Sequence, residues 1–165
     1  MRYFTLVAFA AVFAALPALA LAADPCALMS RADATALLGK PVAAGTAAGP
    51  ARDEDSSGQV SYCTYRAGTS AIIVSVVEFA SPAEAKKSLT LNLVKNRMDD
   101  DGAKVSEESG IGEKSFYAAT TEGSMYVFLK GAKVVGVAIG GEGAPKPAAV
   151  KAALKASAMA VAAKL

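Results

Sequence analysis

Catalysis in proteins most often depends on histidine, and this chain of 165 residues contains none. Serine–histidine and cysteine–histidine nucleophile pairs are therefore excluded, as are metal sites built on imidazole. A serine–lysine dyad remains formally open, but no serine stands in a Ser-x-x-Lys motif at a helix start. The acidic residues cluster in turns and helix ends, where solvation explains them better than paired-carboxylate glycoside hydrolysis does. We expect no enzyme.

An acidic run, Asp-Asp-Asp-Gly at 99–102, matches part of a calcium-binding loop. Asp99, Asp101 and Glu108 would fall at positions three, five and twelve of such a loop. Position one would then be Arg97, a cation where the first carboxylate ligand belongs. A solvated turn is the better interpretation, and we expect neither a metal nor another cofactor.

The N-terminus has the pattern of an export signal. Arg2 gives a positive start, residues 6–21 form an almost continuous apolar run, and Ala20-Leu21-Ala22 offers a small-x-small cleavage site. Residues 1–22 are therefore predicted to be a signal peptide. The remainder, 23–165, has the length of a single domain, and we expect it to be periplasmic or secreted.

Two alternatives to a cleaved signal are disfavoured by proline and aspartate. A retained membrane anchor needs about 20 apolar residues, and Pro17 interrupts the run near its end. Lipid attachment at Cys26 would require a small residue before the cysteine, where Asp24 and Pro25 stand. No stable membrane insertion is expected after signal removal.

Two cysteines, Cys26 and Cys63, occur in a chain expected to enter an oxidising compartment. A disulfide between them would tie the start of the mature chain to a strand, and would stabilise the fold by roughly 3–4 kcal/mol. The alternatives are two free thiols or a metal pair, and two thiolates without histidine make a poor zinc site. We expect the disulfide.

Charge predicts little about partners. Seventeen basic and 15 acidic side chains nearly balance, so no strong field attracts nucleic acid or anionic lipid. With nucleic acid and anionic lipid disfavoured, we expect the partner to be an envelope protein or a small ligand.

Hydrophobic patterns and turn residues divide the chain into helices and strands. Ser30 begins a short helix that Gly39 ends, and a long helix follows Ser81 and reaches residue 98. Another helix follows Pro147. Residues 43–59, rich in Ala, Gly, Pro, Asp and Ser, are predicted to be a surface loop. Strands are predicted at 60–66, 70–79, 103–107, 114–120, 124–129 and 132–139.

These elements predict an α+β fold: an antiparallel sheet of five or six strands, with two long helices on one face and a short N-terminal helix. A shift of 63 positions overlays Gly68 on Gly131 and Pro82 on Pro145. This match suggests a β-β-α pseudo-repeat, and chance similarity of two hairpins is the alternative.

Four short motifs resemble a family of small exported domains of unknown function, best populated among actinobacterial secreted lipoproteins. They are Pro25-Cys26-x-Leu28, Leu37-Leu38-Gly39-x-Pro41-Val42, Cys63-x-Tyr65 and Gly110-Ile111-Gly112-Glu113. The resemblance implies the same fold and a disulfide between the Pro-Cys and Cys-x-Tyr motifs. It brings no established chemistry, and the chain departs from the family in lacking a lipidation site.

Residues 57–62, Ser-Gly-Gln-Val-Ser-Tyr, resemble the loop motif with which periplasmic lysozyme inhibitors enter an enzyme's cleft. Ser57, Gly58, Tyr62 and Tyr65 are therefore candidate binding residues. Strand alternation puts Tyr62 and Tyr65 on opposite sides of the sheet, so we expect one of the two to be exposed at a binding surface.

The function expected from the sequence is that of an exported, non-enzymatic binding or structural module of the cell envelope, with an unknown ligand. An inhibitor of a cell-wall hydrolase is the first alternative, and a hydrolase with unrecognised residues is the second. The binding surface is expected on the sheet face without helices or in the 43–59 segment.

Overall fold

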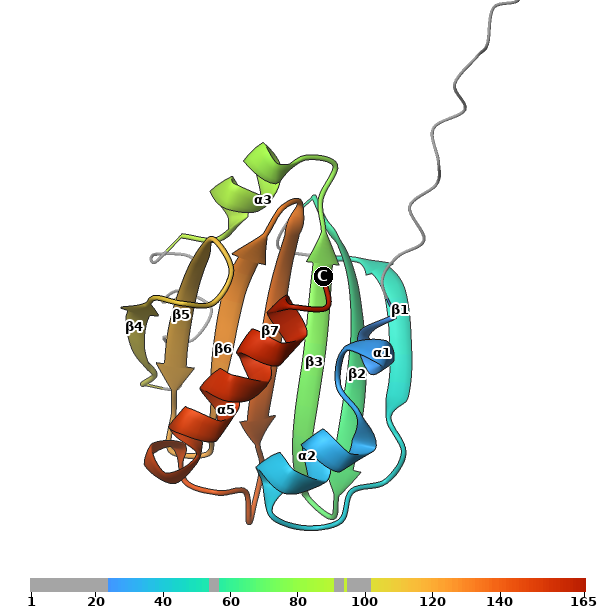
Figure 1. Ribbon diagram of the computed structural model, residues 1–165, viewed down its shortest axis with the longest axis vertical. Coiled ribbons are helices and arrows are strands. Elements are labelled where there is room, and N and C mark those ends of the chain that lie inside the picture. The colour runs from blue at the N-terminus through green and yellow to red at the C-terminus, as the bar shows by residue number, and fades with distance from the viewer. Residues whose placement is uncertain (1–23, 54–56, 91–93, 95–101) are drawn as a thin grey trace, which may run out of the picture.

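Seven antiparallel strands form one sheet in a computed structural model that describes residues 24–53, 57–90, 94 and 102–165 (Figure 1). The strand order is β1-β2-β3-β7-β6-β5-β4. The strands are β1 (Thr46–Arg52), β2 (Gln59–Ala67), β3 (Ser70–Glu78), β4 (Lys104–Glu108), β5 (Lys114–Ala119), β6 (Gly123–Lys130) and β7 (Lys133–Gly140). The α+β class and the antiparallel sheet are thus confirmed.

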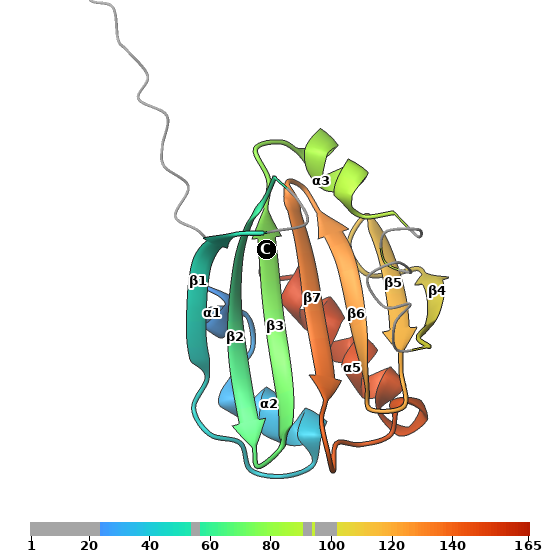
Figure 2. The same cartoon turned by 180° about the vertical axis from the view of Figure 1, so that it is seen from behind.

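Helices α1 (Pro25–Leu28), α2 (Arg31–Leu38) and α5 (Pro147–Ala162) lie on one face of the sheet (Figure 1). Helix α5 contacts β6, β7 and α2, while α1 lies against β2 and β3. Helix α3 (Pro82–Ser88) lies instead at one end of the sheet. Seen from behind, the strands stand in front of α1, α2 and α5 (Figure 2).

The start of α2 follows from its capping residues. The Ser30 hydroxyl accepts the Asp33 N–H at 3.1 Å, and the Asp33 carboxylate accepts the Ser30 N–H at 3.1 Å. The Ser30 hydroxyl also donates to the Asp33 carboxylate at 2.7 Å, and this bond, followed by the bond from the Ser30 N–H, holds the pKa of Asp33 below its ordinary value. Gly39 ends the helix in the left-handed region, with φ 73°, which glycine adopts without steric cost. Both helix boundaries were predicted from these residues.

Strand alternation divides the buried side chains between two clusters. The larger cluster lies between the sheet and helices α1, α2 and α5, and includes Ile72, Val74, Tyr126, Phe128, Val137 and Leu154. The second cluster lies beneath α3 and includes Phe79, Leu89, Val94, Phe116, Val127 and Leu129. Because Phe116 and Val127 point away from α5, they need a separate cover, which Leu89 and Val94 provide.

The predicted number of strands was wrong because β1 occupies part of the segment expected to be a loop. Its sequence, Thr-Ala-Ala-Gly-Pro-Ala-Arg, lacks the large β-branched and aromatic residues that identify strands. The strand forms by pairing with β2 at the sheet edge, and its register shifts between Ala48 and Ala51. A bulge at Gly49 and Pro50 accommodates residues that favour strands poorly.

The expectation of two long helices on one face was also wrong. Helix α3 spans Pro82–Ser88, and Leu89 at its end leaves helical geometry with φ −109° and ψ 81°. Leu89 packs into the second cluster rather than beneath α5. Most of the predicted continuation, residues 91–93 and 95–98, lies outside the described residues.

The 63-position match is found in the strands and not in the helices. Cys63 pairs with Val74, and their counterparts Tyr126 and Val137 pair in the same register. Val74 also pairs with its own counterpart Val137, so a local two-fold axis passes between β3 and β7. Helices α3 and α5 break this symmetry, because they belong to different core clusters.

Replacing Ser30 with alanine removes the cap of α2, and we expect unfolding in urea to require about 1 kcal/mol less free energy. The matched control is Ser109→Ala, since Ser109 is exposed and lies outside any helix. Equal urea midpoints for the two variants would contradict this role of Ser30.

Candidate functional site

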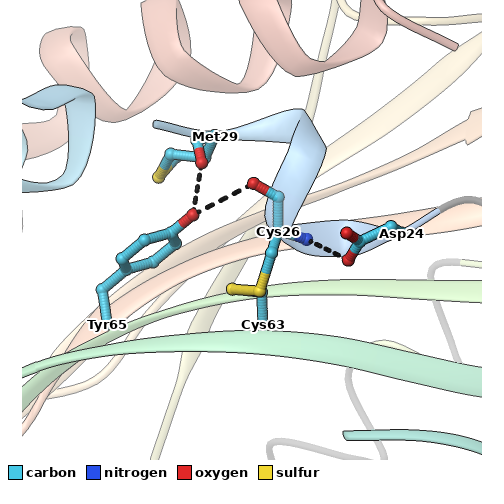
Figure 3. The surroundings of a disulfide bond; sticks show 5 residues. All are labelled: Asp24, Cys26, Met29, Cys63 and Tyr65. Carbon is cyan, nitrogen blue, oxygen red and sulfur yellow. Dashed lines mark hydrogen bonds between the residues drawn. A yellow bond between two sulfur atoms is a disulfide. The ribbon is translucent and has the colours of Figure 1, made fainter. Parts of the chain in front are cut away.

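A disulfide joins Cys26 to Cys63, as predicted, and excludes both free thiols and a metal pair (Figure 3). The two Cα atoms are 5.0 Å apart, and the bond links α1 to β2 across a separation of 37 residues. Cys63 is fully buried in the larger core cluster. The bond therefore fixes α1 onto one particular face of the sheet.

Tyr65 supports the same attachment from β2. Its ring is buried, and its hydroxyl donates to the carbonyl of Met29 and lies 3.3 Å from the carbonyl of Cys26 (Figure 3). Burial, followed by the charges of Asp24 and Asp33, raises the pKa of the Tyr65 hydroxyl. Tyr65 therefore holds the N-terminal segment in place and is not available at the surface.

Tyr62 lies on the opposite face of β2 and is 40% exposed. The expectation that one of the two tyrosines is exposed is therefore confirmed. Ile73 on β3 is also 40% exposed. Since Tyr62 pairs with Ser75 and Thr64 pairs with Ile73, the two exposed side chains occupy neighbouring rows of the same face.

Ser57 and Gly58 lie apart from Tyr62. The Ser57 hydroxyl is 3.4 Å from a carboxylate oxygen of Glu84 in α3. Gly58 is buried, and a Cβ added to it would stand 2.5 Å from Val77. Ser57 and Gly58 precede β2, and Tyr62 lies three residues beyond the strand's first residue, about 10 Å along the strand at ordinary strand rise. Ser57 and Tyr62 therefore do not form one compact patch.

We use "open face" for the part of β2, β3 and β7 that faces away from α1, α2 and α5 and lies outside the cluster beneath α3. Three rows of paired residues cross it, and their middle positions on β3 and β7 are mostly small. The rows are Arg66-Ala71-Gly140, Thr64-Ile73-Ala138 and Tyr62-Ser75-Gly136, in the order β2, β3, β7. The small residues make this part of the sheet a shallow depression between larger neighbours.

A groove of about 410 Å³ lies at one end of the open face. Its floor includes Ala71 and Ala138, and Ile73 and Met125 stand on either side. Two charged side chains, Arg66 and Glu122, lie at the outer end of the groove. Neither makes an ion pair within the described part of the chain.

A different charged cluster fastens α5 to β4. Glu108 accepts from Lys151 at 2.8 Å and lies 3.5 Å from Lys155. The Lys151 ammonium also stands 4.5 Å from the ring centre of Tyr117. The Lys151 hydrogen bond is the main cause that lowers the pKa of Glu108, and the same bond raises the pKa of Lys151. The carboxylate and the two ammonium groups pair with one another, and these pairs attach α5 to the sheet edge.

The structure brings one serine and one lysine together, although no motif predicted it. The Lys40 ammonium donates to the Ser70 hydroxyl at 2.9 Å and to the Gly143 carbonyl at 3.2 Å. The Ser70 hydroxyl in turn donates to the Glu142 carbonyl at 2.7 Å, and Ser70 is fully buried. A catalytic dyad needs an exposed serine whose proton passes to the lysine. Here both groups donate to the 141–143 segment and hold it.

No group of three or more His, Cys, Asp and Glu side chains could hold a metal ion within the described residues. Of the calcium-loop candidates, Asp99 and Asp101 lie outside that part of the chain, and Glu108 is bound by lysines. Among the helices of residues 24–53, 57–90 and 102–165, none is long and apolar enough to cross a membrane. Residues 1–22 are not described, so the signal peptide stays a prediction.

Comparison with protein-family models, with curated proteins and with solved structures found no match to this chain. The resemblance to actinobacterial exported domains is therefore supported only by the disulfide that it implied.

Sequence reasoning missed the groove residues Arg66, Ile73, Glu122 and Met125. One signal could have indicated them: positions 136, 138 and 140 of the predicted last strand are Gly, Ala and Gly. Small residues at every second position leave one sheet face without the large side chains of a core, and they mark a place where a ligand or another backbone can approach closely. The strand's other face, Val135, Val137 and Ile139, has the large residues of a core.

We expect a Cys26→Ala/Cys63→Ala variant to lose roughly 3–4 kcal/mol of unfolding free energy, because the unfolded chain is no longer cross-linked. Denaturant unfolding measures the loss. Reduction of the wild-type protein should reproduce it and should leave the variant unchanged. Alkylation of two thiols in the native wild-type protein would contradict the bond itself.

The Glu108 contacts predict an acid-sensitive contribution to stability. Since folding lowers the pKa of Glu108, its contribution is present above the ordinary carboxyl pKa of about 4.3 and is lost as the pH falls through the lowered value. Glu108→Gln should cost about 1 kcal/mol or less at pH 7, because the lysines are partly exposed.

Thermal unfolding from pH 7 to pH 3 checks this prediction, and the difference between wild type and Glu108→Gln should shrink as the solution becomes acidic. Glu107→Gln is the control, since that neighbour is exposed. A difference that stays constant with pH would show that the carboxylate charge contributes nothing.

Proposed function

We propose that this protein is an exported, non-enzymatic binding module of the cell envelope, and that its open face is the recognition surface. The observation that carries the proposal is the exposure of Tyr62 and Ile73 in neighbouring rows of that face, each 40% exposed. Within the described residues, the other large hydrophobic side chain with comparable exposure is Met159 on α5.

The composition of the open face supports a role in binding. A sheet with one solvated face ordinarily alternates apolar residues inside with polar residues outside. Beyond Val77 and Val134, which belong to the cluster beneath α3, the outward positions of β3 and β7 are Ala71, Ile73 and Ala138, with Ser75 as the polar exception among the non-glycine residues. Isolated exposed apolar residues are common on protein surfaces. A contiguous uncharged surface of this kind favours contact with an apolar partner.

Two observations support export and the absence of catalysis. The disulfide between Cys26 and Cys63 fits an oxidising compartment, in agreement with the predicted signal peptide. Ser70 and Lys40 are the residue types of a catalytic dyad, but each of them donates a hydrogen bond to a backbone carbonyl. A binding module needs neither a nucleophile nor a general base.

Inhibition of a cell-wall hydrolase is the second candidate, favoured by the exposure of Tyr62 within the Ser57-to-Tyr62 motif. The inhibitor candidate predicts that the wild-type protein slows lysozyme and that a Ser57→Ala/Tyr62→Ala variant does not. If wild type and variant leave the lysozyme rate equally untouched, the inhibitor candidate is eliminated. The open-face proposal would be unaffected.

The open-face proposal predicts where a partner contacts the protein. A photo-reactive benzophenone amino acid placed at position 62 or 73 should form covalent adducts in cells that export the protein. The same group at position 159, which is 48% exposed on the helical side, is the matched control. Adducts that are absent from 62 and 73, or equally abundant at 159, would contradict the proposal.

A further inference from the structure

We propose that the groove on the open face binds a single-chain zwitterionic amphiphile, with a phosphate and an ammonium in its head group and a hydrocarbon tail. This inference rests on the proposed function, because it names the ligand class for the same surface. In the bound state the phosphate contacts Arg66, the ammonium contacts Glu122, and the tail lies over Ala138 between Ile73 and Met125.

The register of the strands fixes the two ends of this site. Arg66 pairs with Ala71, Ala71 with Gly140, and Gly140 with Gly123, next to Glu122. Three strand spacings separate Arg66 from Gly123, about 14 Å between backbones. Both residues line the groove, Arg66 from its β2 side and Glu122 from its β6 side. A head group with separated positive and negative charges fits this arrangement.

Both charges are available to a ligand. In the described part of the chain, neither the Arg66 guanidinium nor the Glu122 carboxylate has an ion-pair partner, and both line the groove. A purely anionic amphiphile would bring its charge near Glu122, and a purely cationic one would bring its charge near Arg66. Repulsion from the like charge opposes both, whereas a zwitterion gains from each side.

The neutral part of the ligand should be hydrocarbon because the groove floor offers few hydrogen-bond partners. The outward side chains beneath it are Ala71, Ile73 and Ala138, and their strands pair on both sides in the sheet. A peptide lying there would leave buried amide groups unsatisfied, which costs about 1–3 kcal/mol for each group in protein measurements. A hydrocarbon tail has no such groups and gains from burying Ile73 and Met125.

The second core cluster restricts what else can reach the groove. Leu89 and Val94 are buried against Phe116 and Val127, so a further layer stands on the same face of the sheet beside the groove. This layer leaves less room for a flat sheet from a second copy of the chain than a face without such a layer would. A narrow ligand that enters from the Arg66 end avoids it.

Calorimetric titration of the full exported chain tests the inference, with decylphosphocholine kept below its micelle concentration. We expect saturable binding that is at least about five-fold tighter than binding of decanoate, decyltrimethylammonium, decyl maltoside or the zwitterionic peptide trialanine. Arg66→Gln and Glu122→Gln should each weaken binding about five-fold. The matched controls Arg52→Gln and Glu107→Gln lie on exposed positions of other strands and should leave it unchanged.

Ala138→Phe fills the floor of the groove and should abolish binding, while circular dichroism and the unfolding midpoint show that the sheet remains folded. The inference is overturned if the zwitterionic amphiphile does not bind, if Arg66→Gln and Glu122→Gln bind as well as their controls, or if trialanine binds most tightly.

The outcome also separates this inference from the proposed function. Adducts at positions 62 and 73 without amphiphile binding would mean that the open face recognises another ligand class. Saturable amphiphile binding that Ala138→Phe abolishes, without adducts at 62 and 73, would support the ligand class. It would count against recognition of an envelope partner by Tyr62 and Ile73.

Discussion

The pairing of β3 with β7 is the interaction on which the rest of the fold depends. Every other hydrogen-bonded pair of strands in the described sheet joins neighbours along the chain, β1 to β3 on one side and β4 to β7 on the other. The β3–β7 ladder runs from Ala71 opposite Gly140 to Glu78 opposite Lys133. Without it, the sheet would be two separate meanders, each with an uncovered apolar edge.

The covered face follows from that pairing. Helix α5 lies over β6 and β7 and reaches α2, while the Cys26–Cys63 bond holds α1 over β2 and β3. Both attachments act on the same side of the central ladder. Helices α1, α2 and α5 therefore bridge the two halves from one face, and on the other face the part of β2, β3 and β7 outside the α3 cluster stays uncovered. The groove with Arg66 and Glu122 is a result of this one-sided arrangement, since its two charges come from opposite halves of the sheet.

The features that depend on local residues could be predicted from the sequence. The Ser30 cap, the Gly39 helix end, the Gly68 and Gly131 turns and the alternation of Tyr62 and Tyr65 each depend on a few neighbouring positions. Strand β1 could not be predicted, because its residues form a strand only when β2 supplies the hydrogen-bond partners. The partner of β3, the position of α3 and the Lys40–Ser70 contact depend on residues far apart in the chain. Local sequence patterns contain no information about which distant side chain will lie beside a given residue in the fold.

The two outermost strands determine how the sheet ends. An unpaired strand edge is a template on which another chain can add, and natural sheets oppose this with bulges, proline and charge. Strand β1 has a register shift and Pro50, which has no N–H to donate. Strand β4 is five residues long and contains Lys104, Glu107 and Glu108. Strand addition in the manner of amyloid growth is thus opposed at both margins of the described sheet, which disfavours the joining of two copies edge to edge.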